Sequence, residues 1–276
     1  MTSTLAMQLG PLRKTRRSWV RSFNWTGVAT LLALVVLWEV LDRAGALSFD
    51  FIPAPSEIVG GVGELVIESS LQSAVLHTAS VALTGWAIAC VIGVGVGIAL
   101  GLSRTAYTWT AASIEVLRSF PSITFVPLAV LLFGFSYTME LVVVVYAATW
   151  QVLVNTLEGV RAVGPGLRDV ARTFHLAGLR RVTAIIMPAA AGKIIVGMRL
   201  GLNLALILAV AAEVVGNPEG LGYGLVVEQN ALRPDRMFVF FISVGLLGIV
   251  LNAILQWILA RALPGVTAAA ERGRRS

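Results

Sequence analysis

Residues 164–188 read GPGLRDVARTFHLAGLRRVTAIIMP, a polar, arginine-rich stretch between two very apolar segments. Apolar side chains recur in it at helical spacing, at Leu167, Val170, Ala171 and Phe174. Because charged residues lie on the opposite face, this first part is expected to be an amphipathic helix. A break at 175–178 precedes a second helical stretch at 179–186, which is expected to end at Pro188. The pattern predicts a helix-turn-helix hairpin with a small apolar tip at Leu176-Ala177.

Two interpretations of this hairpin are open from its pattern alone. Gly164-Pro165-Gly166 separates it from the preceding apolar run, and Pro165 suits a first helical turn. An exposed apolar tip can insert into a groove on a partner protein. An amphipathic hairpin can also lie on the lipid surface.

The composition is typical of a polytopic membrane protein. The chain is 57% hydrophobic and 13% charged, whereas a soluble domain has about 25% charged residues. Apolar runs of membrane-spanning length recur, so we expect an all-α fold with about six transmembrane helices. The single cysteine, Cys90, excludes an internal disulfide, and His77 and His175 form no Cys/His cluster, which argues against a metal. The net charge of +6 does not indicate nucleic-acid binding, because the basic residues lie at the ends of apolar runs.

The expected spans are residues 25–41, 74–102, 107–135, 140–157, 193–215 and 237–259. The first is expected to be an uncleaved helix rather than a signal peptide, because it is long and no clear cleavage site follows. Pro121 and Pro127 either kink the third span or end a helix. A short amphipathic helix is expected after an N-cap at Ser56, and a loop at 216–236.

Glycines recur at intervals of four residues in two spans, at Gly93, Gly97 and Gly101 and at Gly197 and Gly201. This spacing puts them on one helix face, where they favour close helix contact.

Basic residues predict the orientation. Sixteen lysines and arginines fall on the side of the termini and of the hairpin, against Arg43, Arg233 and Arg236 on the other side. We therefore expect a multi-pass protein of the cell membrane with both termini in the cytosol. The expected organisation is a cytosolic basic tail at 1–24, a transmembrane domain at 25–262 with a cytosolic loop at 160–190, and a second basic tail at 263–276.

Several blocks of this sequence, taken in their order and spacing, resemble the membrane-spanning permease subunits of bacterial ABC importers of the nitrate/sulfonate/taurine type. The blocks include 52–59, 77–80, 117–121, 126–128, 155–156, 211–213 and 220–223. The cytosolic loop of that family carries Glu-Ala-Ala, then Gly, then Ile-x-Leu-Pro. The positions of this chain that align with the loop motif are Asp169, Val170, Ala171, His175, Ile185, Met187 and Pro188. Met187 replaces the family's Leu, and His175 replaces its Gly.

The resemblance implies a pore of two permease copies, with one ATPase subunit beneath each loop and an extracytoplasmic solute-binding protein that delivers a sulfonate, taurine, nitrate or bicarbonate. ATP would be bound by the partner subunit, since the chain lacks a phosphate-binding loop and is expected to be neither an enzyme nor a cofactor carrier. The residues that would couple to the ATPase are the aligned ones together with Leu176, Ala177 and Gly178.

Polar and kinked positions inside the spans are candidates for the translocation pathway: Arg118, Pro121, Trp150, Gln151, Asn155, Arg199, Asn203 and Glu213. Arg118 or Arg199 could favour an anion. The preferred interpretation is structural, with Arg118 paired to Glu115 and Arg199 to a neighbouring acid. His77 is expected to be a hydrogen-bonded interfacial histidine rather than a proton relay. A stand-alone proton-coupled transporter is the alternative function, although the spans offer few carboxylates for it.

Overall fold

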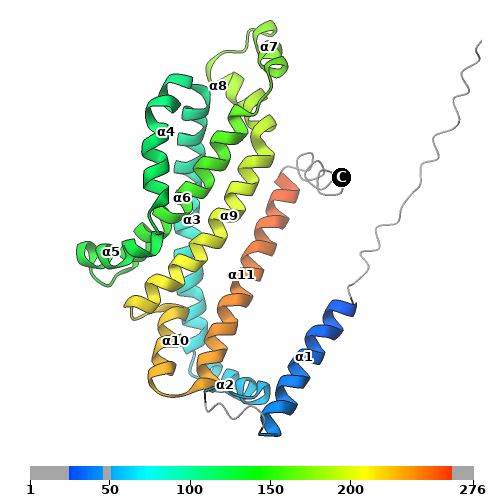
Figure 1. Cartoon of the computed structure of the whole chain (residues 1–276), viewed down its shortest axis with the longest axis vertical. Coiled ribbons are helices and arrows are strands. Elements are labelled where there is room, and N and C mark those ends of the chain that lie inside the picture. Colours follow the sequence, from blue (N-terminus) through cyan, green and yellow to red (C-terminus); the bar gives the residue numbers. More distant parts are fainter. Residues whose placement is uncertain (1–24, 46–50, 263–276) are drawn as a thin grey trace, which may run out of the picture. The chain divides into compact units, whose positions relative to one another are not determined.

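The computed structural model describes residues 25–45 and 51–262 (Figure 1). The two basic tails predicted at 1–24 and 263–276 lie outside these residues. The chain divides into two units, residues 1–47 and 48–276. In the first unit, α1 (Trp25–Arg43) forms the predicted first span, and Arg43 pairs with Glu39 one turn earlier at 2.6 Å.

The regular elements among the described residues of the second unit are all helices. Its elements are α2 (Pro55–Ile67), α3 (Ser70–Leu102), α4 (Arg104–Ser119), η1 (Ser122–Thr124), α5 (Phe125–Phe133), α6 (Tyr137–Arg161), α7 (Pro165–Thr173), α8 (Gly178–Arg181), η2 (Val182–Ile186), α9 (Met187–Val215), α10 (Gly220–Asn230) and α11 (Pro234–Ala262). The all-α prediction is confirmed. By length and composition, the described helices include five candidate membrane spans, or six if the bent pair of α4 with η1 and α5 is one span.

Three long helices, α3, α6 and α9, pack against one another and form the centre of this unit (Figure 1). Gly93 and Gly97 of α3 lie directly against α6, so that a Cβ at either would come within 2.7 Å of Val152 or Thr156. Gly95, on another face of the same helix, has no atom within 4 Å of that position. The close contact predicted from the glycine spacing is therefore confirmed, because only these faces leave no room for a side chain.

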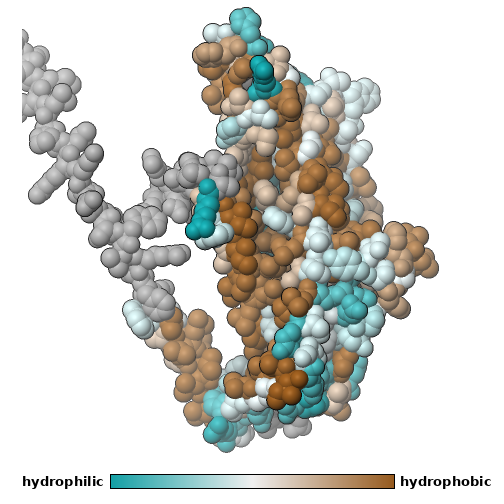
Figure 2. Space-filling view, turned by 180° about the vertical axis from the view of Figure 1, so that it is seen from behind, coloured by the Kyte–Doolittle hydropathy of each residue, from teal (hydrophilic) through white to brown (hydrophobic). Residues whose placement is uncertain are grey.

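Large apolar side chains remain exposed along the long helices, among them Val91, Ile207 and Ile249. On the face seen in Figure 2, hydrophobic surface (brown) extends over the middle of the helical unit, and much of the hydrophilic surface lies toward its ends. A surface of this kind is typical of helices that face lipid.

The third predicted span is broken. Its two halves meet at an angle of 73°. Pro121 lies in the break in a non-helical conformation, since α4 ends at Ser119 and Phe120 is extended. Pro127 lies in the first turn of α5, where a missing backbone N–H is tolerated. Pro121 therefore ends a helix, and Pro127 begins one.

Pro188 does not end a helix, contrary to the prediction. The helix runs without interruption from Gly178 to Val215, so the fifth span begins well before residue 193. The π-turn of η2 explains this continuity, because the N–H of Met187 donates to the carbonyl of Val182 five residues earlier. A shifted hydrogen-bond ladder of this kind accommodates the N–H that proline lacks.

Two further local predictions are wrong. The expected loop at 216–236 contains α10, an eleven-residue helix whose buried side includes Leu221 and Glu228. Its three glycines hid the helical pattern. The N-cap of α2 is Ala54 rather than Ser56, because Pro55 already occupies the first helical position and the Glu57 carboxylate accepts the Ala54 N–H at 3.2 Å.

Candidate functional site

Helix α7, the first arm of the hairpin, ends in a Schellman turn. The N–H of His175 donates to the carbonyl of Arg172 at 2.9 Å, and that of Leu176 donates to the carbonyl of Ala171 at 2.8 Å. His175 has φ +51° and so occupies the left-handed position that glycine usually fills in this motif. The turn therefore survives the replacement of the family's glycine, and Gly178 provides a second left-handed residue at φ +54°.

Apolar side chains are exposed on this hairpin, outside the spanning helices. They are Leu167, Val170, Phe174 and Leu179, and Phe174 and Leu179 are 71% and 78% exposed. Asp169 and Arg172 form an exposed pair at 3.4 Å. An exposed apolar cluster flanked by charges is the kind of surface that a partner or a lipid interface covers.

The base of the hairpin is anchored in the helical core. Val163 and Ile186, which flank it in the chain, are buried in one cluster with Val160, Ala190 and Ile194. Ala171 is also buried, while Ala177, Met187 and Pro188 are exposed. The two ends of the hairpin are therefore packed against α6 and α9.

The predicted pathway residues do not form one cluster. Arg118 makes two hydrogen bonds to Glu115, at 2.7 and 2.8 Å, which confirms their pairing. Trp150 packs edge-on against Tyr146, and its Nε1 atom is buried without a hydrogen-bond partner among the described residues. Tyr146 in turn donates to the carbonyl of Leu117 at 2.7 Å and ties α6 to α4.

Gln151 and Asn155 lie in the contact of α6 with α9. The side chain of Asn155 donates to the carbonyl of Gln151 at 2.8 Å, and both residues adjoin Gly197. They are helix–helix contacts here. Asn203 is exposed on another face of α9 and accepts a hydrogen bond from Asn252 of α11 at 2.5 Å.

Glu213 is fully buried and tied to the start of α10. Its carboxylate accepts hydrogen bonds from Thr78 at 2.7 Å and from the N–H of Gly222 at 2.8 Å. The hydroxyl oxygen of Thr78 also accepts the N–H of Leu221 at 2.9 Å. Glu213 thus joins α3, α9 and α10, as expected of a buried acid whose hydrogen bonds are satisfied.

A second buried carboxylate, Glu140, lies close by. It accepts hydrogen bonds from Asn217 at 2.5 Å and pairs with Nε2 of His77 at 2.9 Å. The other ring nitrogen of His77 lies 2.8 Å from Glu219. The prediction of a hydrogen-bonded His77 is confirmed.

His77, Glu140 and Glu213 each offer a possible ligand atom within 4.8 Å of the others. The sequence suggested no such group, because 63 residues separate His77 from Glu140 and only helix packing unites them. Since Thr78, Asn217 and the N–H of Gly222 already donate to these oxygens, the arrangement fits a structural polar junction better than a metal site.

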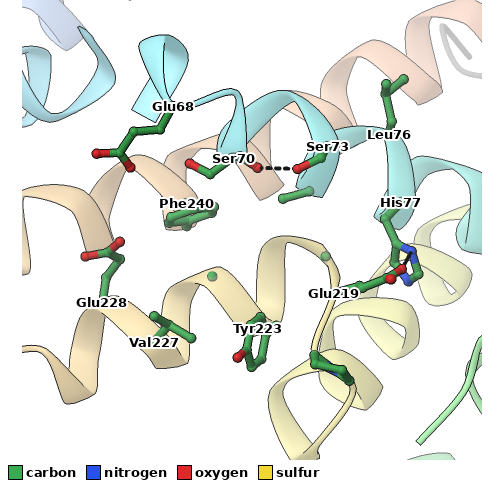
Figure 3. Close-up of a pocket in the computed structure, with 14 residues that line it drawn as sticks. Glu68, Ser70, Ser73, Leu76, His77, Glu219, Tyr223, Val227, Glu228 and Phe240 are labelled. Carbon is green, nitrogen blue, oxygen red and sulfur yellow. Dashed lines mark hydrogen bonds and ion pairs between the residues drawn. The ribbon is translucent and has the colours of Figure 1, made fainter. Parts of the chain in front are cut away.

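A cavity of about 640 Å³ opens beside this junction, between α3, α10 and α11. Figure 3 shows His77 and Glu219 at one end and Glu68 and Glu228 at the other. Arg236 neutralises the second end, since it lies 2.8 Å from Glu68 and 3.6 Å from Glu228.

Lowering the pH is expected to weaken the link between α2 and α11. Hydrogen bonds from Arg236 and then Arg233 hold the pKa of Glu64 below its ordinary value. A depressed carboxyl pKa stabilises the fold above the unfolded pKa, about 4.3, and this contribution is lost as the pH falls through the folded pKa. Glu64→Gln should therefore lower the unfolding temperature at pH 7, and this difference from the wild type should shrink as the pH falls through the folded pKa of Glu64. Thermal unfolding of both purified proteins across that acid range checks this, and a difference that stays constant would contradict it.

Comparisons with known proteins agree with this fold. Residues 91–267 match the family described as "Binding-protein-dependent transport system inner membrane component". The putative aliphatic sulfonates transport permease protein SsuC of Bacillus subtilis is 27% identical over 247 residues, 90% of this chain and 87% of that protein. The bicarbonate transport system permease protein CmpB of Synechococcus elongatus is 26% identical over 84% of this chain and 86% of that protein.

A solved structure shares the fold. An inward-facing structure of the MetNI methionine ABC transporter contains a chain with a TM-score of 0.60 and 18% identity, covering 72% of this chain and 97% of that one. The family match extends over more than half of the sequence and includes the hairpin, Glu140 and Glu213. This chain therefore belongs to the family of inner membrane components of binding-protein-dependent transport systems, the permease subunits of ABC importers.

Proposed function

We propose that this chain is the membrane-spanning subunit of an ATP-driven importer for a small anion. The observation that carries the proposal is the hairpin, whose apolar residues stay exposed although its base is buried in the core. An ATPase subunit with a matching groove would cover Phe174 and Leu179. The residues of the proposed coupling surface are Asp169, Val170, Ala171, His175, Leu176, Ala177, Gly178, Ile185, Met187 and Pro188.

In the proposed mechanism, ATP binds to the partner and the chain itself carries no cofactor. Closure of two ATPase subunits moves the hairpins, and the buried cluster around Val163 and Ile186 passes that movement to α6 and α9. The helices then alternate between inward-facing and outward-facing arrangements. We further propose two copies of this chain per pore, cytosolic termini, and a binding protein that delivers substrate from outside.

The proposed substrate is a small anion such as a sulfonate, taurine, nitrate or bicarbonate. Support comes from the names of the related permeases, which refer to aliphatic sulfonates and to bicarbonate.

A stand-alone proton-coupled transporter is the second candidate, and one observation favours it. Glu140 and Glu213 are both fully buried close to His77, and buried carboxylates of this kind carry protons in many transporters. Their hydrogen bonds to Asn217 and Thr78 and the exposed apolar hairpin argue for the first proposal.

Reconstitution into proteoliposomes tests the two functions. In the presence of the partner ATPase and binding protein, uptake of labelled taurine, nitrate or bicarbonate should require ATP. The ATP must be supplied on the side of the membrane where the ATPase is bound. Omission of the ATPase should abolish that uptake. Uptake driven by an imposed proton gradient without any ATPase would overturn the proposal and support the second candidate.

A further inference from the structure

One cation in the middle of a spanning helix has no counter-charge among residues 25–45 and 51–262. Arg199 lies near the centre of α9 and is partly exposed, and within the described chain it makes no ion pair or hydrogen bond. The prediction that a neighbouring acid neutralises it is wrong for the described residues. The nearest acid along α9, Glu213, is four turns away and bound by Thr78 and Gly222.

The helices packed on α9 supply no acid at this level either. Helix α3 contains no Asp or Glu, and α11 contains none beyond Asp235 in its first turn. Helix α6 carries Glu140, which is bound by Asn217, and Glu158, which pairs with Lys193 at 3.1 Å. Arg199 thus leaves a net positive charge in the middle of the helical unit.

Other polar side chains lie on the face of α9 that carries Arg199. Asn203 follows Arg199 by one turn of α9 and accepts a hydrogen bond from Asn252 of α11. The two helices lie side by side and run in opposite directions (Figure 1). The contact between residues 203 and 252 therefore sets Gln256, which is exposed, at the level of Arg199.

Contact with lipid is unfavourable for this row of polar side chains. An ionised arginine with exposed amides beside it is strongly disfavoured against hydrocarbon, and intramembrane charges ordinarily face a water-filled path or a partner. The charge of Arg199 favours anions over other solutes at this position, because an unneutralised guanidinium attracts anions and also binds them bidentately.

We propose that Arg199, Asn203, Asn252 and Gln256 form an anion-attracting strip on the wall of the translocation pathway, with Arg199 as the residue that selects for negative charge. This inference rests on the proposed function and deepens it by assigning the charge filter to α9 and α11. A small oxyanion in transit exchanges part of its hydration for the guanidinium and the amide donors, and then moves on because no second cation in the described helices holds it at this level.

Charge-selective labelling tests the strip without knowledge of the substrate. The single cysteine, Cys90, is buried and is first replaced by alanine. Gln256→Cys is then introduced into the full-length chain, which is reconstituted with its partner subunits. Modification rates are measured with an anionic and a cationic methanethiosulfonate, the sulfonatoethyl and the trimethylammonioethyl reagents.

The anionic reagent should react faster. Arg199→Gln should lower the ratio of anionic to cationic rates on the order of tenfold, and Arg199→Lys should preserve it. Ile254→Cys, exposed on the opposite face of α11 at similar depth, should react with neither reagent because lipid covers it.

Two results would overturn the inference. Absence of labelling at Gln256→Cys would mean that lipid or a second copy covers the strip, and an unchanged ratio in Arg199→Gln would mean that Arg199 sets no charge preference. Labelling does not depend on ATP. A negative result in the uptake assay, which would count against the importer proposal, is therefore distinguishable from a negative labelling result, which would count against charge selection by Arg199.

Discussion

Deletion of residues 176–178 is expected to abolish co-purification of the ATPase subunit with this chain. The deletion removes the N–H of Leu176, which closes the turn at the end of α7, and the left-handed Gly178 that begins α8. Without them Phe174 and Leu179 cannot be presented together. The measurement is affinity purification of this chain from detergent-solubilised membranes, with quantification of the bound ATPase.

A point variant separates loss of the contact from loss of the fold. Phe174→Ala leaves the backbone turn intact and should weaken ATPase binding at least tenfold, since a central aromatic typically contributes about 2 kcal/mol or more. Thr183→Ala, exposed on the same hairpin but outside its apolar cluster, should bind like the wild type. Normal ATPase binding by the deletion variant, with reduced association to lipid vesicles instead, would assign the hairpin to the membrane surface.

Gly220→Ala is expected to destabilise the protein by about 2–6 kcal/mol. Gly220 has φ +93°, and a Cβ there would overlap the buried carboxylate of Glu213. The strained backbone costs about 1–3 kcal/mol, and displacement of a buried acceptor from its donors costs a similar amount. The change would therefore loosen the junction that ties α10 to α3 and α9.

Gly134→Ala is the matched control for Gly220→Ala. Gly134 also has a positive φ, +66°, but no atom lies within 4 Å of its Cβ position. It should show only the backbone cost of about 1–3 kcal/mol. Thermal unfolding of both purified variants measures the difference, and equal destabilisation would show that the contact with Glu213 is unimportant.

The hairpin was well predicted from the sequence because its signals are local. The helical spacing, the break near His175 and the second helix are all present, and the break coincides with the left-handed conformation of His175. The continuation through Pro188 was not predicted, because a π-turn depends on a hydrogen-bond shift that residue types do not reveal.

The candidate pathway residues were predicted less well, because several of their contacts are with residues on other helices. The pairing of Arg118 with Glu115 was predicted, since both lie on one helix face three residues apart. Glu140 was missed because its partner His77 lies 63 residues away in the chain. Helix α10 was taken for a loop because its three glycines hid the helical pattern.

The sequence by itself determined the membrane class, the family and the position of the hairpin, because hydropathy, charge at span ends and local spacing depend on neighbouring residues only. The tertiary structure alone decided which acids and cations meet. Burial brings Glu140, Glu213 and His77 together and supplies their donors, whereas helix packing leaves Arg199 without an acid among the described residues. These outcomes depend on the relative placement of α3, α6, α9 and α11, on which hydropathy and local spacing carry no information.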